Sequence, residues 1–134
     1  METAIATHIS KPKLLVDVFI MIVSIFLLIE GIWGTVSPVV FGVFSTNLLH
    51  AIIHIVLGGV GLFLSLRANS VGFSIILGVL LLIVGLLYFV QRLQTDLVEL
   101  LNINTNVAVF NIVVGLLCLA VAIPSQLKPR VQRM

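Results

Sequence analysis

Apolar residues fill four long runs of this chain, and short polar segments separate them. The runs extend over residues 14–35, 48–66, 72–90 and 107–123. A helix needs roughly 17 to 25 such residues to cross the hydrocarbon core of a membrane. Each run has about that length, and none alternates apolar with polar residues as a strand of a transmembrane barrel does. The pattern therefore predicts an all-α, polytopic membrane protein with four transmembrane helices.

The second run carries a stripe of small and polar residues spaced three or four apart. Residues at these spacings share one face of a helix. In a membrane this face turns toward other helices, because small residues let backbones approach closely and hydrocarbon does not solvate imidazole. The stripe consists of Asn47, His50, His54, Gly58, Gly61 and Ser65.

Similar stripes in the other three runs predict a compact four-helix bundle. In the first run the stripe holds Ser24, Gly31 and Gly34. In the third and fourth runs it includes glycines that recur on one face. The glycines expected at helix crossings are Gly58, Gly61, Gly78, Gly85 and Gly115.

The two halves of the chain resemble each other. SIFLLIEGIWG at 24–34 aligns with GVLLLIVGLLY at 78–88, an offset of 54 residues. HIVLGGVGL at 54–62 aligns with NIVVGLLCL at 111–119, an offset of 57. We interpret this as a duplicated two-helix hairpin, with halves related by an axis along the membrane normal. Chance similarity between apolar segments is the alternative.

Composition agrees with a membrane location. Of the 134 residues, 60% are hydrophobic and 9% charged, and the mean hydropathy is +1.31. Such a chain cannot cover a water-exposed surface with polar groups, so we expect no soluble domain. The net charge of +2 requires no nucleic acid. The expected partner is the lipid bilayer, with a homo-oligomer or a membrane-complex partner as further candidates.

The basic residues indicate an orientation. If the four spans alternate, six of the seven Lys and Arg residues fall on one side, and Arg92 alone falls on the other. The positive-inside rule then predicts that both termini are cytoplasmic. The outer loops are expected at 36–47 and 91–106. The layout is a cytoplasmic tail at 1–13, a four-helix transmembrane domain at 14–123 and a basic cytoplasmic tail at 124–134.

The two outer loops are apolar enough to stay near the membrane. Ser37-Pro38 ends helical geometry, and VVFGVF after it is expected to lie at the outer interface. LQTDLVELL, at 93–101, is either a short amphipathic helix on the membrane surface or a solvated loop.

Four ionisable side chains fall inside the apolar runs, where each costs about 2.5 kcal/mol or more at a helix centre. Asp17 lies near the cytoplasmic end of the first run, where it can reach the surface or pair with Arg67. The other three are Glu30, His50 and His54, and all lie in the outer half.

These three residues are expected at similar depth, and the repeat puts Asn111 at the level of His54. We therefore expect Glu30, His50, His54 and Asn111 to form one polar cluster. Tyr88 is expected near its rim, together with Trp33.

The cluster has several interpretations. His50 and His54 at i and i+4, with Glu30 as third ligand, would suit a divalent metal. A chain of His, Glu and Tyr would instead pass protons. Either His is able to ligate a tetrapyrrole. In the simplest interpretation the same groups only hydrogen-bond helices together, and the protein has no cofactor.

Motifs of soluble enzymes are absent from the sequence. GGVG at 58–61 is not a phosphate loop, because it lies inside an apolar run and lacks the following Lys and Ser or Thr. Ser24, Ser65 and Ser74 have no His and carboxylate within reach at the same depth. We therefore expect a protein that is not an enzyme.

The second run suggests a family. The segment HIVLGGVGL, with His54 followed by Gly58 and Gly61, resembles the His-x-x-x-Gly-x-x-Gly-Leu signature of domain of unknown function family 4383, small bacterial proteins with four membrane helices. The preceding FGVFSTNLLHAIIH is similar to that family's approach to its second helix. The resemblance covers roughly residues 14–123.

The second half of the chain departs from the pattern of this family. The family's fourth helix often begins with an Asn and a His, but here Asn111 stands where the His is expected, and Val107 matches His50. The resemblance implies four spans and a bacterial inner-membrane location, and it brings no known activity. We expect a structural or accessory membrane component, with a small transport, proton-relay or metal-binding protein as the alternative.

Overall fold

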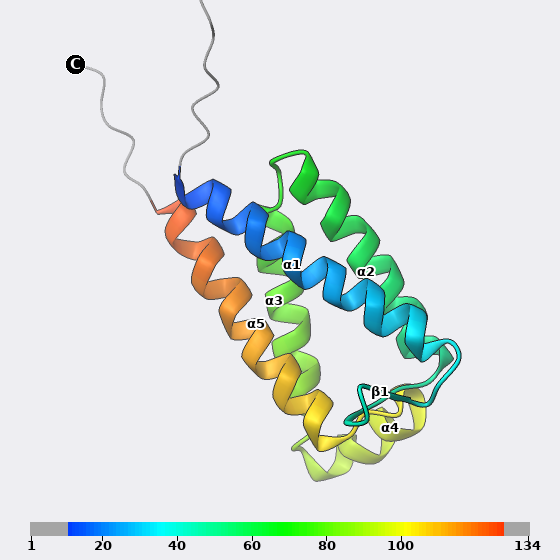
Figure 1. Cartoon of the computed structure of the whole chain (residues 1–134). Coiled ribbons are helices and arrows are strands. Elements are labelled where there is room, and N and C mark those ends of the chain that lie inside the picture. The colour runs from blue at the N-terminus through cyan, green and yellow to red at the C-terminus, as the bar shows by residue number, and fades with distance from the viewer. Residues whose placement is uncertain (1–10, 128–134) are drawn as a thin grey trace, which may run out of the picture.

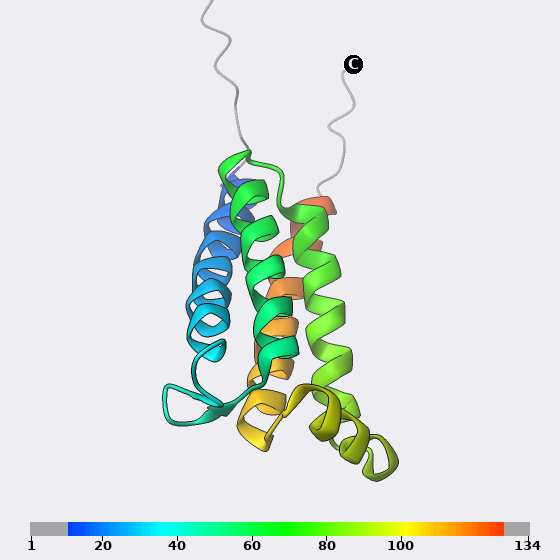
Figure 2. The same cartoon turned by 90° about the vertical axis from the view of Figure 1, so that its right-hand side faces the viewer.

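Helices make up nearly all of the computed structural model, which describes residues 11–127 (Figure 1). A short β-hairpin joins the first two helices. The elements are α1 (Lys11–Gly34), β1 (Val39–Val40), β2 (Phe44–Ser45), α2 (Leu48–Leu66), α3 (Val71–Leu87), α4 (Gln91–Leu101) and α5 (Thr105–Gln126). Figure 2 shows α1, α2, α3 and α5 running the length of the bundle, with α4 lying across one end.

Within residues 11–127, three helices are long and apolar enough to cross a membrane, namely α1, α2 and α5. The number rises to four if α3 and α4 count as one span, bent by 115° at the break between them. The chain is thus an all-α, polytopic membrane protein, as the apolar runs predict. By itself α3 has 17 residues, at the short end of the range for a membrane span.

The helix bounds differ from the predicted runs mainly at their ends. The predicted run 48–66 coincides with α2. The third run was predicted to continue to Val90, but α3 ends at Leu87 and the chain turns sharply into α4. The helices α1 and α5 extend into the predicted tails, to Lys11 and Gln126. Residues 1–10 and 128–134 of those tails lie outside the described residues.

A close crossing joins α1 to α2, and an equivalent one joins α3 to α5. A Cβ atom added to Gly31 would lie 2.8 Å from the Ala51 carbonyl oxygen, and one added to Gly85 would lie 2.7 Å from the Ala108 oxygen. Both distances are shorter than real Cβ contacts. The two pairs are related by the offsets of the sequence repeat, 54 residues from Gly31 to Gly85 and 57 from Ala51 to Ala108.

The reverse contacts repeat in the same way. A Cβ on Gly58 would lie 3.0 Å from the Leu28 nitrogen, and a Cβ on Gly115 would lie 2.9 Å from the Leu82 nitrogen. The same offsets relate these residues. Both halves of the chain therefore use the same glycine contacts to pack a two-helix hairpin, which is what a duplication predicts. Gly61 and Gly78 likewise leave no room for a side chain, against Ser24 and Gly115 respectively.

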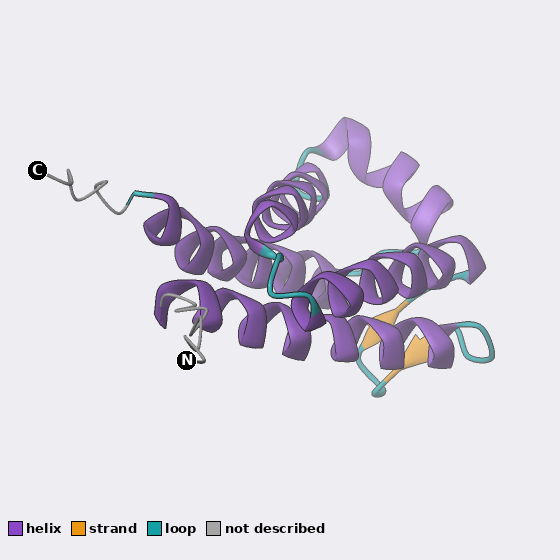
Figure 3. Ribbon diagram, turned by 90° about the horizontal axis from the view of Figure 1, so that it is seen from above, coloured by secondary structure: helices purple, strands orange, loops and turns teal. Residues whose placement is uncertain are grey.

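An apolar core lies between α1, α3 and α5. The views agree that α5 packs beside both α1 and α3 (Figures 1 and 3). The aliphatic faces that point outward are exposed, as expected for helices in contact with lipid. The buried core residues are Val16, Ile20, Val23, Leu27, Leu77, Leu81, Val114 and Cys118.

The loop between α1 and α2 and the segment between α3 and α5 fold onto each other and cover one end of the bundle. The segment VVFGVF forms a β-hairpin, which the sequence pattern did not predict, with Phe41 and Gly42 at positive φ in its turn. LQTDLVELL belongs to the helix α4, so the helical alternative holds. Asn102 donates from Nδ2 to the Thr46 carbonyl at 2.8 Å, and Asn104 donates to the Val43 carbonyl at 2.8 Å.

Asp17 is held differently from its prediction. Its carboxylate accepts hydrogen bonds from the backbone N–H and the hydroxyl of Ser70, and it is 5% exposed. The pairing with Arg67 was wrong, because the Arg67 guanidinium lies over the Phe63 ring instead, 4.9 Å from its centroid. Asp17 thus fixes the turn between α2 and α3 to α1.

Candidate functional site

Asn47 determines where α2 begins and so places both histidines. Its side chain accepts a hydrogen bond from the His50 N–H at 2.9 Å, a regular N-cap. One turn later His54 lies on the same face of α2. This face packs on α1, where Glu30 occupies the last turns of the helix. The exposed fractions are 3% for His50, 4% for His54 and 2% for Glu30.

The three side chains form a linear chain of contacts in the half of the bundle nearer α4. Glu30 Oε2 lies 3.1 Å from His54 Nδ1. His54 Nε2 lies 3.0 Å from His50 Nε2, and His50 Nδ1 lies 3.1 Å from the Leu101 carbonyl oxygen. We call this set, Glu30, His54, His50 and the Leu101 carbonyl, the buried polar chain. It joins α1, α2 and the C-terminus of α4.

The Leu101 carbonyl decides which nitrogens carry protons. A carbonyl only accepts, so His50 Nδ1 must hold a proton. If His50 is neutral, its Nε2 is then an acceptor, and His54 Nε2 must donate to it. His54 Nδ1 therefore faces Glu30 with one proton between them, on the carboxyl or on the ring. Without that proton, a lone pair and a carboxylate would face each other at 3.1 Å.

Glu30 is close to His54 but does not form a regular hydrogen bond with it. Oε2 is fully buried and has no regular hydrogen-bond partner within residues 11–127, although it lies 3.1 Å from His54 Nδ1. A buried acceptor in this state costs free energy, about 1 to 3 kcal/mol when it is left without a partner.

A cavity of about 110 Å³ adjoins both histidines. Asn111 of α5 lines its other side, and the remaining walls are aliphatic side chains of α2, α3 and α4. Its volume exceeds that of a single water molecule, and its histidines and amide offer polar partners for water. It lies well below the range of about 300 to 1,000 Å³ typical of small-molecule sites.

Tyr88 lies apart from the polar residues with which it was grouped. Its hydroxyl is 3.2 Å from the Thr105 Oγ1, and its ring packs with Ile103, Val107 and Ala108. It does not line the cavity beside His54. Trp33 is 43% exposed and packs edge-on against Phe41 of the hairpin. The rim of the site is therefore aliphatic.

The three expected metal ligands meet in a line and not at a point. His54 uses opposite ring nitrogens for His50 and for Glu30, so one ion cannot contact all three in this arrangement. Within residues 11–127, no three His, Cys, Asp or Glu side chains are grouped so that they could hold a metal ion. Metal binding by Glu30, His50 and His54 stays a prediction.

Sequence reasoning did not find the partner that closes the buried polar chain. The last carbonyls of α4 have no N–H donor inside their own helix, and residues at the start of α2 supply donors to them. Asn47 Nδ2 donates to the Leu100 oxygen at 2.9 Å, and His50 Nδ1 donates to the Leu101 oxygen at 3.1 Å. Asn102, in the left-handed conformation, ends α4 at this point. The predicted amphipathic segment 93–101 ends just before this Asn, but its sequence does not indicate which side chains meet its last carbonyls.

The model of the family described as domain of unknown function (DUF4383) matches residues 17–123. No curated protein and no solved structure matches the chain. The match spans all the helices that contribute to the buried polar chain, and it confirms the resemblance seen in HIVLGGVGL. The chain belongs to the DUF4383 family of domains of unknown function.

Proposed function

We propose that this protein is a membrane component that binds and releases one proton at its buried polar chain, and that it is not an enzyme. The single observation that carries this proposal is the continuous contact from Glu30 through His54 and His50 to Leu101, with atom separations of 3.0 to 3.1 Å. Carboxyl and imidazole are the side chains best suited to exchange a proton near neutral pH.

Charge balance supports the proposal. With one proton between Glu30 and His54, the set is electrically neutral, either as acid and neutral imidazole or as carboxylate and imidazolium. A proton can therefore move between the two residues without leaving a net charge in the apolar surroundings. Loss or gain of a proton would leave a net charge, which is costly at this depth and so couples protonation to the packing of the bundle.

The repeat supports the proposal by a second route. The position of Glu30 is occupied in the other half by Val84, that of His50 by Val107 and that of His54 by Asn111. The second hairpin nevertheless makes the same glycine contacts as the first. A hairpin of this shape thus packs without the acid and both imidazoles, so the glycine crossing does not by itself require them.

The structural or accessory role expected from the sequence is the contrasting proposal. It requires that the three groups only hold helices together and never exchange a proton. We also propose the bacterial inner membrane as the location, as the family resemblance implies. Both termini would be cytoplasmic, because six of the seven basic residues would then lie inside. Reporter fusions at both termini test that orientation.

Infrared difference spectroscopy across a pH titration tests proton binding. The protein is reconstituted in lipid, and spectra are compared in H₂O and D₂O. We expect the band of a protonated carboxyl that titrates, shifts in D₂O and disappears in Glu30→Gln. Glu99→Gln is the matched control, because Glu99 is an exposed acid on α4. It should leave that band in place.

The outcomes separate the two proposals. A carboxyl band lost only in Glu30→Gln, together with altered imidazole bands in the same titration, supports proton exchange along the buried polar chain. Spectra of the wild type and of Glu30→Gln that are equal at every pH at which the protein stays folded would overturn it and leave the structural role.

A further inference from the structure

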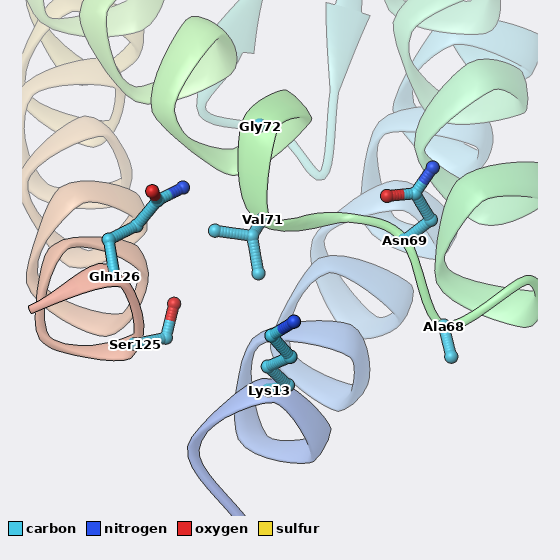
Figure 4. Close-up of a pocket in the computed structure, with 7 residues that line it drawn as sticks. All are labelled: Lys13, Ala68, Asn69, Val71, Gly72, Ser125 and Gln126. Carbon is cyan, nitrogen blue, oxygen red and sulfur yellow. The ribbon is translucent and has the colours of Figure 1, made fainter. Parts of the chain in front are cut away.

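A polar pocket lies at the end of the bundle opposite to α4. It has a volume of about 380 Å³ and is formed where α1 begins, α5 ends and the chain turns from α2 into α3. Figure 4 shows Lys13, Gln126 and Asn69 extending toward the same space from these three segments. This pocket is separate from the buried polar chain and does not depend on the function proposed for it.

Several groups that line this pocket can donate hydrogen bonds. Lys13 supplies an ammonium group, and the amides of Asn69 and Gln126 each supply an NH₂. Val71 and Gly72 line the pocket as the first residues of α3, where backbone N–H groups have no acceptor within their helix. Donors that converge from three segments around one cation suit an anion.

The acidic side chain nearest this end does not line the pocket, and one of its oxygens, Oδ1, is bound by Ser70, while Oδ2 is buried without a hydrogen-bond partner among the described residues. Asp17 lies one turn beyond Lys13 on α1, is buried, and accepts from the backbone N–H and hydroxyl of Ser70. Among residues 11–127, the other acids belong to the last turns of α1 and to α4, at the far end of the bundle. Ser125 already donates its hydroxyl to the Ala122 carbonyl at 2.7 Å.

The position of the pocket favours a phosphate carried by a lipid. The pocket lies at the ends of membrane-spanning helices, which is the depth of the headgroups. The chain's basic residues also gather at this end, with Lys11 and Lys13 on α1 and Arg67 after α2. Basic pockets between helices at the cytoplasmic surface are typical sites for anionic headgroups.

We propose that this pocket binds the phosphate group of an anionic phospholipid, with Lys13 as its principal cation and the amides of Asn69 and Gln126 as further donors. The headgroup would close the space between α1, α5 and the α2–α3 turn. Bound lipid would therefore link the first hairpin to the second and stabilise the bundle against unfolding.

The test measures lipid binding to the full chain in detergent by native mass spectrometry and by thermal unfolding. The probes are phosphatidylglycerol, phosphatidylcholine and inorganic phosphate. The variants are Lys13→Ala and Lys13→Arg. Lys11→Ala is the matched control, because Lys11 is an exposed lysine on the same turn of α1 that does not line the pocket.

We expect phosphatidylglycerol to bind more tightly than phosphatidylcholine and to raise the unfolding temperature of the wild type. Lys13→Ala should weaken phosphatidylglycerol binding about fivefold, while Lys13→Arg and Lys11→Ala should keep it, since one lysine near a headgroup contributes about that factor. Stabilisation by inorganic phosphate alone, lost in Lys13→Ala, would support the anion site and identify its source as soluble phosphate.

Two results would overturn the proposal. Equal losses in Lys11→Ala and Lys13→Ala would show attraction to the charged surface as a whole and not to this pocket. Equal binding of phosphatidylglycerol and phosphatidylcholine by the wild type would show that the phosphate group is not recognised through charge.

Discussion

His54 Nδ1 lies 3.1 Å from Glu30 Oε2, between two helices whose backbones approach closely at Gly31 and Gly58. The glycine crossing and this polar contact occupy neighbouring turns of α1 and α2. The crossing holds the two backbones close together, and it therefore decides how near the carboxyl and the imidazole must lie. The contact between carboxyl and imidazole and the packing of the two helices therefore depend on the same interface.

Two substitutions of Glu30 distinguish the contribution of its shape from that of its acidic proton. Glu30→Ala leaves His54 Nδ1 without a partner in a buried place and should destabilise the protein by about 1 to 3 kcal/mol. Glu30→Gln should cost much less, because its NH₂ can donate to His54 Nδ1 as the carboxyl proton does. Thermal unfolding in lipid or detergent measures both variants. Equal losses in the two would contradict a shared proton at this contact.

The second half of the chain supplies a variant that should remove the chemistry and keep the fold. Glu30→Val, His50→Val and His54→Asn together give the first hairpin the residues that the second has at Val84, Val107 and Asn111. The variant should stay folded, with a loss of about 1 to 3 kcal/mol from the Leu101 carbonyl, which no longer has a donor.

Circular dichroism and the infrared titration measure this triple variant. We expect native helix content and no titrating carboxyl band. A variant that does not fold would show that the three polar groups are needed for packing, which is the structural proposal.

Glycine substitutions should differ sharply with position. Gly31→Ala places a methyl group 2.8 Å from the Ala51 carbonyl oxygen, whereas a Cβ on Gly59 would meet nothing within 4 Å. Forcing an extra methyl group into a packed crossing costs typically about 1 to 3 kcal/mol. Chemical unfolding in micelles should show that loss for Gly31→Ala and for Gly85→Ala. Gly59→Ala should be neutral or slightly stabilising.

Asp17 should matter for stability and Arg67 should not. Asp17→Ala removes the acceptor for the N–H and hydroxyl of buried Ser70, at an expected cost of about 1 to 3 kcal/mol. Arg67→Ala removes only an exposed stacking contact with Phe63, worth about 0.5 to 1 kcal/mol at most. Thermal unfolding of Asp17→Ala and Arg67→Ala measures the two losses of stability. A loss in Arg67→Ala as large as in Asp17→Ala would restore the predicted Asp17 and Arg67 pair.

The protein purified gently from its membrane should contain no stoichiometric metal and no tetrapyrrole. His54 cannot direct one nitrogen to both His50 and Glu30, and the adjoining cavity of about 110 Å³ is small for an organic cofactor. Elemental analysis and an absorption spectrum measure this. A metal lost in a His50→Ala, His54→Ala double variant would reverse the expectation and assign the site to that ion.

Local patterns along the sequence determined the helices and their buried faces. Apolar runs fix where helices can lie in a membrane, and residues three and four apart share a face whatever their neighbours are. His50, His54, Gly58 and Gly61 are buried on α2 as this periodicity predicts, and α2 has its predicted bounds. The repeat was readable for the same reason, because the crossings need small residues at matching positions.

Only the tertiary structure decided which groups meet. Contact between helices depends on their rotation and relative height. Both follow from packing at the glycine crossings, which involves two helices and so cannot be read from the sequence of either one alone. Tyr88 therefore pairs with Thr105 instead of joining the histidines, and Asp17 pairs with Ser70 instead of Arg67. The direction of each imidazole nitrogen also depends on its neighbours. The C-terminus of α4, folded back over α2, presents the Leu101 carbonyl to His50 and so completes the buried polar chain.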